Sequence, residues 1–304
     1  MSKIKIGYFA DGPWAHEALK LLISDQEFEI VFICVRYDTR DPALIDMGGK
    51  LGIQCLWHKN INSDEFHMIM KKFEFDIFVS MSFNQIFRPR TYELPKLKTI
   101  NCHAGALPYY RGRNILNWAL INDEKEFGIT VHYIDEGIDT GDIIIQNTYP
   151  IKDDDSYRTL LETSHKECAI LLHQALRLIH TKSVNPTPQS SIHPVGFYCS
   201  ARKEGDEVLN WNQSSREIFN FVRAICDPGP RARSYVGDVE IYINRVELID
   251  GATNYIGIPG VILNKDENGY FWIKTADSFV RLTEYRSDRK LRVGDRLCSG
   301  IGKI

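Results

Sequence analysis

The segment KIKIGYFADGPWAHEALKLLI, residues 3–23, decides the fold class of this chain. Residues 3–10 have the apolar content of a buried strand, ADGP (10–13) predicts a turn, and residues 14–23 have helical apolar spacing. Similar alternation continues downstream, with strands predicted at 29–35, 76–82 and 98–103 and helices at 42–53 and 63–73. Strands that alternate with helices indicate parallel βαβ units, so we predict an α/β, Rossmann-like doubly wound sheet.

The second half of the chain changes character after a long helical stripe that starts near residue 157. The Pro- and Ser-rich stretch 183–196 predicts a linker, and the short, closely spaced strands after it predict a small, mostly β domain, an OB-like barrel. A length of 304 residues is enough for two cores. We predict a catalytic domain at 1–190, a linker at 191–210 and an OB-like C-terminal domain at 211–304.

The composition of the chain bears on its partners, its cellular location and its capacity to bind a metal. With 43% hydrophobic and 25% charged residues and a net charge of −3, the chain has the composition of an ordinary globular protein without a basic domain, so we expect no nucleic acid partner. No apolar run reaches membrane-spanning length and the N-terminus lacks a signal-like pattern, so we expect a cytoplasmic protein with no membrane partner. The seven cysteines form no CxxC pair, which argues against a metal site.

The segment TINCHAGALPYYRGRN, residues 99–114, holds the candidate site. Residues two apart in a strand point to one face, so Asn101 and His103 project together while Cys102 points the other way into the core. They lie at the carboxyl end of a predicted strand, where α/β sheets bind ligands. Taken alone, the pair is also consistent with two side chains that cap the following loop.

A second segment, GIDTGD (137–142), places Asp139 between two glycines in a tight loop. Asp139 either bonds its own turn or, if the loop closes over the strand end, accepts a hydrogen bond from His103. With Asn101 as a donor to developing negative charge, these groups form an acyl-transfer site without a covalent nucleophile. Arg111 and Arg113 would suit phosphate or carboxylate recognition, or form a solvated basic loop.

These residues resemble the folate-dependent formyltransferases. The match covers Asn101-Cys102-His103, the segment 107–112, Thr130 and the segment 135–142, and it continues into the C-terminal stretches 202–211, 222–230 and 233–238. The resemblance implies catalytic roles for Asn101, His103 and Asp139 and the co-substrate 10-formyltetrahydrofolate. It also implies folate contacts at Gln85, Ile86, Phe87, Arg113, Asp135, Glu136, Gly137 and Ile138.

Within the family, residues 111–118 and the ValArgAla-x-x-AspPro motif are closest to sugar-nucleotide N-formyltransferases such as the aminoarabinose enzyme of lipid A modification. This implies a UDP- or dTDP-linked amino sugar as the acceptor, surface glycan biosynthesis as the context, and a homodimer. We expect substrate contacts at Gly12, Arg111, Tyr198 and Arg202. The alternatives are a methionyl-tRNA formyltransferase and a non-catalytic folate- or nucleotide-binding module.

One departure from the family pattern stands beside the predicted histidine. The family usually has His-x-Ser-Leu-Leu-Pro, whereas this chain continues from His103 with Ala104, Gly105 and Ala106 before Leu107. The loop loses a hydroxyl group and some bulk, and the sequence alone gives no physical account of the change.

Overall fold

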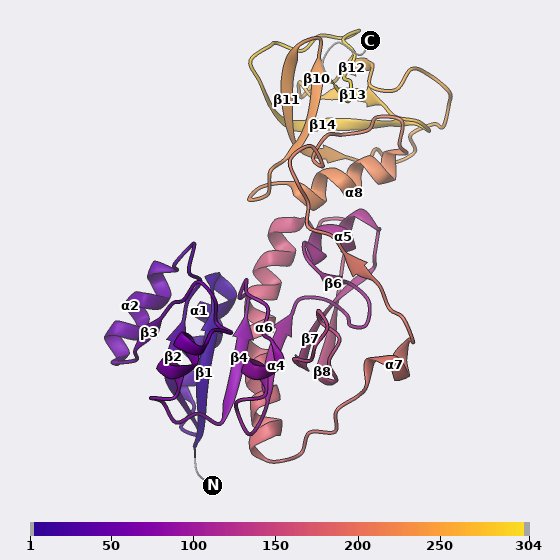
Figure 1. The fold of residues 1–304 in the computed structure, drawn as a ribbon. Coiled ribbons are helices and arrows are strands. Elements are labelled where there is room, and N and C mark those ends of the chain that lie inside the picture. Colours follow the sequence, from indigo (N-terminus) through magenta and orange to yellow (C-terminus); the bar gives the residue numbers. More distant parts are fainter. Residues whose placement is uncertain (1–2, 301–304) are drawn as a thin grey trace. The chain divides into compact units, whose positions relative to one another are not determined.

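A seven-stranded sheet in the order β3-β2-β1-β4-β5-β7-β8 forms the centre of the first half of the protein (Figure 1). The computed structural model describes residues 3–300. Strands β3, β2, β1, β4 and β5 pair in parallel, as the alternation of strands and helices predicts, whereas β7 runs antiparallel to β5. The strands are β1 (Ile4–Ala10), β2 (Phe28–Cys34), β3 (Cys55–Leu56), β4 (Ile77–Met81), β5 (Thr99–His103), β7 (Glu126–Tyr133) and β8 (Ile143–Pro150).

The predicted helices form with ends within a few residues of the expected positions. The helices are α1 (Gly12–Ser24), α2 (Pro42–Leu51), α3 (Asp64–Met70), α4 (Pro89–Tyr92), α5 (Ile115–Ile121), α6 (Tyr157–His180), α7 (Gln189–Ile192) and α8 (Ser215–Ile225). Helix α6 packs across the sheet, because the carbonyl of Cys168 lies 3.6 Å from the Cys102 thiol of β5. Farther along this helix, Nε2 of His173 lies 2.8 Å from Oδ2 of Asp25, just before β2.

An aromatic cluster around Phe9 anchors the loop that follows β4. The ring of Phe9 makes edge contacts with five other phenylalanine rings, which belong to Phe32, Phe66, Phe78, Phe83 and Phe87. Because edge-to-face aromatic pairs have a preferred geometry, the cluster fixes the position of the chain after β4 as well as filling the core. The cluster therefore packs the loop after β4 against the carboxyl end of β1.

A five-stranded antiparallel sheet forms the C-terminal part, in the order β10-β11-β14-β13-β12. Its strands are β10 (Ala232–Val236), β11 (Val239–Glu247), β12 (Ile262–Lys265), β13 (Phe271–Lys274) and β14 (Phe279–Ser287). The fold class predicted from the sequence, an α/β sheet followed by a mostly β domain, is confirmed.

The chain divides into two compact units that are not contiguous in sequence. The first comprises residues 1–112, 127–149 and 162–199, and the second comprises 113–126, 150–161 and 200–304. The predicted linker region contains ordered structure of the first unit, because β9 (Tyr198–Cys199) pairs in parallel with β6 (Arg111–Gly112). The domain boundaries at residues 190 and 210 stay a prediction.

Candidate active site

The polar pair on β5 faces a second polar pair on β7. In the antiparallel register, Asn101 lies opposite His132 and His103 lies opposite Thr130. Cys102 points away from this face into the core, as predicted, and is 7% exposed. The antiparallel strand therefore adds two side chains to a site that the parallel strands alone would not complete.

Hydrogen-bond acceptors lie on both sides of the His103 ring. Its Nε2 is 2.7 Å from the carbonyl oxygen of Tyr110, and its Nδ1 is 3.6 Å from Oδ2 of Asp139. Because a carbonyl oxygen only accepts hydrogen bonds, Nε2 carries a proton in this arrangement. The ionised Asp139 lies beside Nδ1, so both ring nitrogens of His103 face hydrogen-bond acceptors.

Asp139 lies at the centre of the β7–β8 loop, in a left-handed backbone conformation with φ of +55°. Its Oδ2 accepts a hydrogen bond of 2.9 Å from the backbone N–H of Gly112. Burial disfavours the charge and raises the pKa of Asp139, but the neighbouring His103 and the hydrogen bond from His132 lower it. The net effect holds the pKa of Asp139 well below its ordinary value, so the group is a carboxylate.

The tightness of this loop explains its glycines. A Cβ on Gly141 would lie 1.9 Å from the carbonyl oxygen of Tyr133, and one on Gly137 would lie 2.0 Å from the hydroxyl of Thr140. Asp135 holds the same turn, since its Oδ1 accepts hydrogen bonds from the Thr140 hydroxyl and the Gly137 backbone. The loop therefore closes over the carboxyl end of β5 and brings Asp139 to His103, as one of the two sequence interpretations requires.

His132 is a site residue that the sequence reasoning missed. It is 2% exposed, and its Nδ1 lies 2.8 Å from the carbonyl oxygen of Tyr133. Its Nε2 lies 3.2 Å from Nδ2 of Asn101 and 3.5 Å from Oδ1 of Asp139. His132 thus touches two of the three predicted catalytic residues. Thr130 and His132 lie two residues apart on β7, so the period-2 spacing of a strand was the signal that could have found His132.

The Ala104-Gly105-Ala106 loop is shaped by contacts with the site. A Cβ on Gly105 would lie 2.5 Å from Nε2 of His103 and 2.6 Å from the carbonyl oxygen of Tyr110. The carbonyl of Gly105 accepts a hydrogen bond of 2.7 Å from the Thr130 hydroxyl. Glycine at this position therefore leaves room for the short contact between His103 and the Tyr110 carbonyl.

The predicted folate residues fall into two loops and one separate position. Gln85 turns inward, with Oε1 bonded to the Ile61 backbone and Nε2 to the carbonyl of His58, and Phe87 is buried in the aromatic cluster. Ile86 and Ile138 are each 52% exposed. The remaining residues of this set are the loop residues Asp135, Glu136 and Gly137, and Arg113, which is exposed and belongs to the second unit.

Residues next to both loops pack against the same aromatic cluster. Tyr92, which ends the helix after the first loop, and Ile134, which precedes the second, both pack against the cluster that contains Phe87. The cluster therefore supports the chain beside both loops, each of which carries one exposed isoleucine, Ile86 or Ile138.

The predicted substrate residues are placed as follows. Gly12 begins α1, and its backbone N–H donates to Asp41 at 2.8 Å. Arg111 is buried and lies over the exposed ring of Tyr198 at 5.3 Å. Arg202 belongs to the second unit, where its guanidinium contacts the rings of Trp118 and Phe221.

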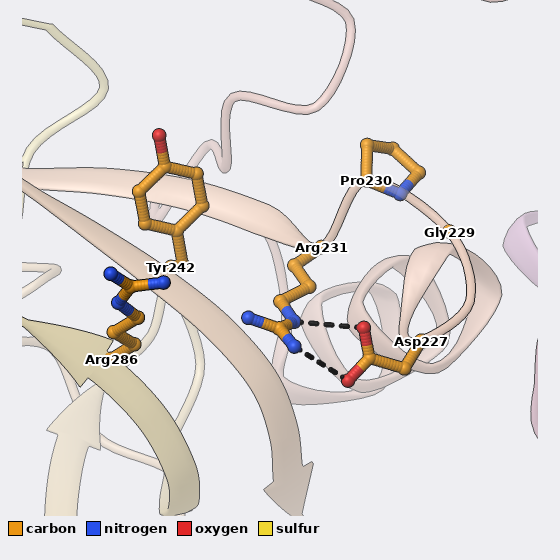
Figure 2. A pocket seen from close by; sticks show the side chains of 6 residues that line it. All are labelled: Asp227, Gly229, Pro230, Arg231, Tyr242 and Arg286. Atoms are coloured by element: carbon orange, nitrogen blue, oxygen red, sulfur yellow. Dashed lines mark hydrogen bonds and ion pairs between the residues drawn. The ribbon is translucent and has the colours of Figure 1, made fainter.

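A hollow of about 200 Å³ lies in the second unit. The residues that line it are drawn in Figure 2 and are Asp227, Gly229, Pro230, Arg231, Tyr242 and Arg286. Arg231 forms a paired hydrogen bond to the Asp227 carboxylate at 2.9 and 2.8 Å, which compensates its charge. None of the lining residues is among the predicted site residues. Among residues 3–300, no helix is both long and apolar enough to cross a bilayer, and no three His, Cys, Asp or Glu side chains are grouped as metal ligands.

Comparison with known proteins identifies the family of both units. Residues 40–176 match the family described as formyl transferase, and residues 202–297 match its C-terminal domain. The methionyl-tRNA formyltransferase of Pelotomaculum thermopropionicum is 32% identical over 258 residues, which cover 84% of this chain and 80% of that protein.

Two solved structures share the fold over nearly the whole chain. WlaRD, a sugar 3-N-formyltransferase crystallised with dTDP and 5-N-formyl-THF, has a TM-score of 0.70 at 23% identity and covers 96% of this chain and 100% of its own. An N-formyltransferase from Helicobacter canadensis, in complex with folinic acid and dTDP-3-aminofucose, has a TM-score of 0.68 at 22% identity. It covers 94% of this chain and 100% of its own.

Proposed function

Because this chain belongs to the formyltransferase family, we propose that it transfers a formyl group from 10-formyltetrahydrofolate to the amine of a UDP- or dTDP-linked amino sugar. The observation that carries the proposal is the meeting of His103, Asp139 and the Asn101 amide at one strand end. These groups supply a proton carrier, an orienting carboxylate and a hydrogen-bond donor, which acyl transfer from an already activated donor needs.

In the proposed reaction the acceptor amine attacks the formyl carbon. A C–N bond forms to the amine, the bond from the formyl carbon to N10 of the folate breaks, and the amine proton ends on N10. Asn101 donates to the formyl oxygen as it gains negative charge, together with a water or with a protonated His103 whose Nε2 has left the Tyr110 carbonyl. Asp139 orients the His103 ring and stabilises its charge, and His103 relays the proton. Much of the acceleration comes from holding two substrates together.

Residues 85–87 and 135–138 would hold the co-substrate. Their exposed isoleucines, Ile86 and Ile138, would cover the apolar faces of the pterin, while the backbone around Gln85 and Gly137 would contact its polar edge. Arg113 would contact the folate, and Gly12, Tyr198 and Arg202 would contact the nucleotide sugar.

The choice of acceptor rests on two observations that point the same way. Sugar N-formyltransferases recur among the solved structures that share this fold. Residues 201–304 hold 16 Lys and Arg against 15 Asp and Glu, so the C-terminal region has a net charge of only +1. A tRNA ligand requires phosphate neutralisation, which favours a more basic surface.

Methionyl-tRNA is the second candidate acceptor. A specific observation favours it, because a relative that is 32% identical over 84% of this chain is a methionyl-tRNA formyltransferase. The two candidates share the same catalytic groups and differ in the size and charge of the acceptor. A non-catalytic folate-binding module is a remote alternative, since the proposed trio is intact in this chain.

Parallel formylation assays on the two kinds of acceptor distinguish these functions. The protein is incubated with 10-formyltetrahydrofolate and a panel of UDP- and dTDP-linked amino sugars, and mass spectrometry follows the gain of one formyl group. In parallel, charged initiator tRNA is tested for formylation and for salt-sensitive binding. Formylation of a nucleotide sugar is the expected result. Formylation of the tRNA alone would reverse the assignment, and folate binding without turnover on any acceptor would favour the binding module.

The remaining features of the proposal concern the biological setting. We expect a cytoplasmic homodimer that acts in surface glycan biosynthesis, and light scattering of the purified protein tests the dimer. Limited proteolysis tests the proposed boundary region, residues 191–210, by the positions of the first cuts.

A further inference from the structure

The side chain of Gln189 links the two segments that hold the proposed catalytic pair. Gln189 is 3% exposed and begins α7, inside the Pro- and Ser-rich stretch 183–196. Its Nε2 donates to the backbone carbonyls of Asp139 and Gly141, at 2.9 and 2.8 Å. Its Oε1 accepts two hydrogen bonds from Arg111, from Nε at 3.1 Å and from Nη2 at 2.7 Å. The amide therefore uses both donors and both acceptor sites.

Arg111 lies in the middle of the second segment. The residues on either side of it contact the site directly, since the carbonyl of Tyr110 accepts from His103 and the N–H of Gly112 donates to Asp139. The guanidinium itself turns inward and is 8% exposed, with Nη1 bonded to the carbonyl of Val195 at 3.1 Å. Fixing Arg111 thus fixes the two backbone groups that hold the catalytic side chains.

The loop around Asp139 needs such an external constraint. A non-glycine residue at φ of +55° is uncommon, and it persists where the surroundings determine the backbone. Gln189 holds the carbonyl of Asp139 itself and that of Gly141 two residues later, so the orientation of both peptide groups is set from outside the loop.

We propose that Gln189 is a positioning residue for Asp139, and that Arg111 acts through Gln189 on the same loop. The proposal rests on the proposed function only in that Asp139 acts in the reaction. It gives Arg111 a structural task in the site in place of the substrate contact expected from the sequence.

Two variants of Gln189 distinguish the hydrogen bonds that it donates from those that it accepts. Gln189→Glu keeps the length and the acceptor for Arg111 but cannot donate to the two carbonyls, and Gln189→Met keeps the volume without any of the hydrogen bonds. We expect kcat to fall at least tenfold in both, with KM for donor and acceptor within about twofold, because orientation and not binding is lost. Values of kcat within twofold of wild type in both variants would overturn the proposal.

Asn117→Ala is the matched control. Asn117 is a buried amide in the second unit that donates to the carbonyl of Ala224, so its removal costs a comparable hydrogen bond in another place. Its kcat should stay near wild type at a similar change in melting temperature. A kcat loss in Asn117→Ala equal to that in Gln189→Met would mean that lost stability alone explains the effect.

The pairing with Arg111 is tested by a double-mutant cycle. If Arg111 acts through Gln189, Arg111→Met and Gln189→Met together should lower kcat no more than about twofold beyond the worse single variant. Losses that multiply, or a rise in acceptor KM confined to Arg111→Met, would show that Arg111 acts on the substrate instead.

Hydrogen exchange gives a readout that needs no substrate. The Gly112 N–H is bonded to Asp139, so its exchange should become at least tenfold faster in Gln189→Met while the amides of β1 and β4 stay unchanged. Unchanged Gly112 exchange would overturn the positioning role. Faster Gly112 exchange in a protein that formylates no acceptor would contradict the proposed function and leave the positioning role standing.

Discussion

Asn101 and His132 lie directly opposite one another on β5 and β7, with Nδ2 of the amide 3.2 Å from Nε2 of the imidazole. Because Nδ1–H of His132 donates to the Tyr133 carbonyl, Nε2 is free to accept from Asn101 or, when protonated, to donate to Asp139. The imidazole of His132 therefore contacts both Asn101, the proposed oxyanion donor, and Asp139, the proposed orienting carboxylate.

From this contact we expect His132→Ala to lower kcat by roughly 10- to 100-fold, because Asn101 loses the partner that orients its amide. The loss should be smaller than that of a His103 variant. Steady-state kinetics measure it, with His173→Ala as the control, since His173 pairs with Asp25 away from the site. Equal activity of His132→Ala and His173→Ala would contradict a role for His132 in the site.

His103→Ala should remove most of the turnover. Loss of a group that relays a proton costs on the order of 10²- to 10⁴-fold in kcat. The far-UV circular dichroism spectrum and the affinity for the folate co-substrate should stay close to wild type, because the ring contacts the Tyr110 carbonyl and Asp139 and none of the predicted folate residues. Near-wild-type turnover in this variant would refute the mechanism.

Asp139→Asn should reduce both activity and stability at neutral pH. The pKa of Asp139 is held below its ordinary value, so the folded state binds its proton less readily than the unfolded chain does. The carboxylate therefore stabilises the fold above the ordinary carboxyl range, and this contribution is lost as the pH falls through the folded-state pKa. Urea unfolding measures the difference between wild type and Asp139→Asn, which should be largest near pH 7 and shrink below about pH 4. A difference independent of pH would show that Asp139 is not held as a carboxylate.

Gly105→Ala tests the loop that departs from the family pattern. The added methyl group would lie 2.5 Å from Nε2 of His103 and 2.6 Å from the Tyr110 carbonyl, so the ring or the backbone must move. We expect at least a tenfold loss of kcat. Ala104→Gly, a neighbouring change in the same loop, serves as the control and should keep most of the activity. A Gly105→Ala protein with normal kcat would show that the loop adjusts without disturbing His103.

Much of the site could be predicted because strand periodicity is local. The spacing of Asn101 and His103 places both on one face, and β5 indeed ends at His103. Asp139 could be proposed because its flanking glycines indicate a tight loop, and the close approach of Gly141 to the Tyr133 carbonyl bears this out.

The parts that could not be predicted depend on contacts between distant segments. The direction of β7 relative to β5 is not encoded in the alternation of either strand, so the pairing of Asn101 with His132 remained hidden. Gln189 lies in a Pro- and Ser-rich stretch without apolar periodicity, and its burial results from hydrogen bonds to residues about 50 and 78 positions away. The burial of the Arg111 guanidinium likewise depends on hydrogen bonds to residues that are distant in sequence, Gln189 and Val195.

The register between β5 and β7 has a consequence for how this protein can change in evolution. Since side chains alternate between the two faces of a strand, deleting or inserting one residue within β5 would exchange the catalytic face for the core face and present Cys102 where His103 now lies. A point substitution near the site changes one side chain, whereas a length change in residues 99–103 or 126–133 displaces every side chain of the catalytic face at once. Insertions and deletions among functional relatives should therefore fall outside these two strands.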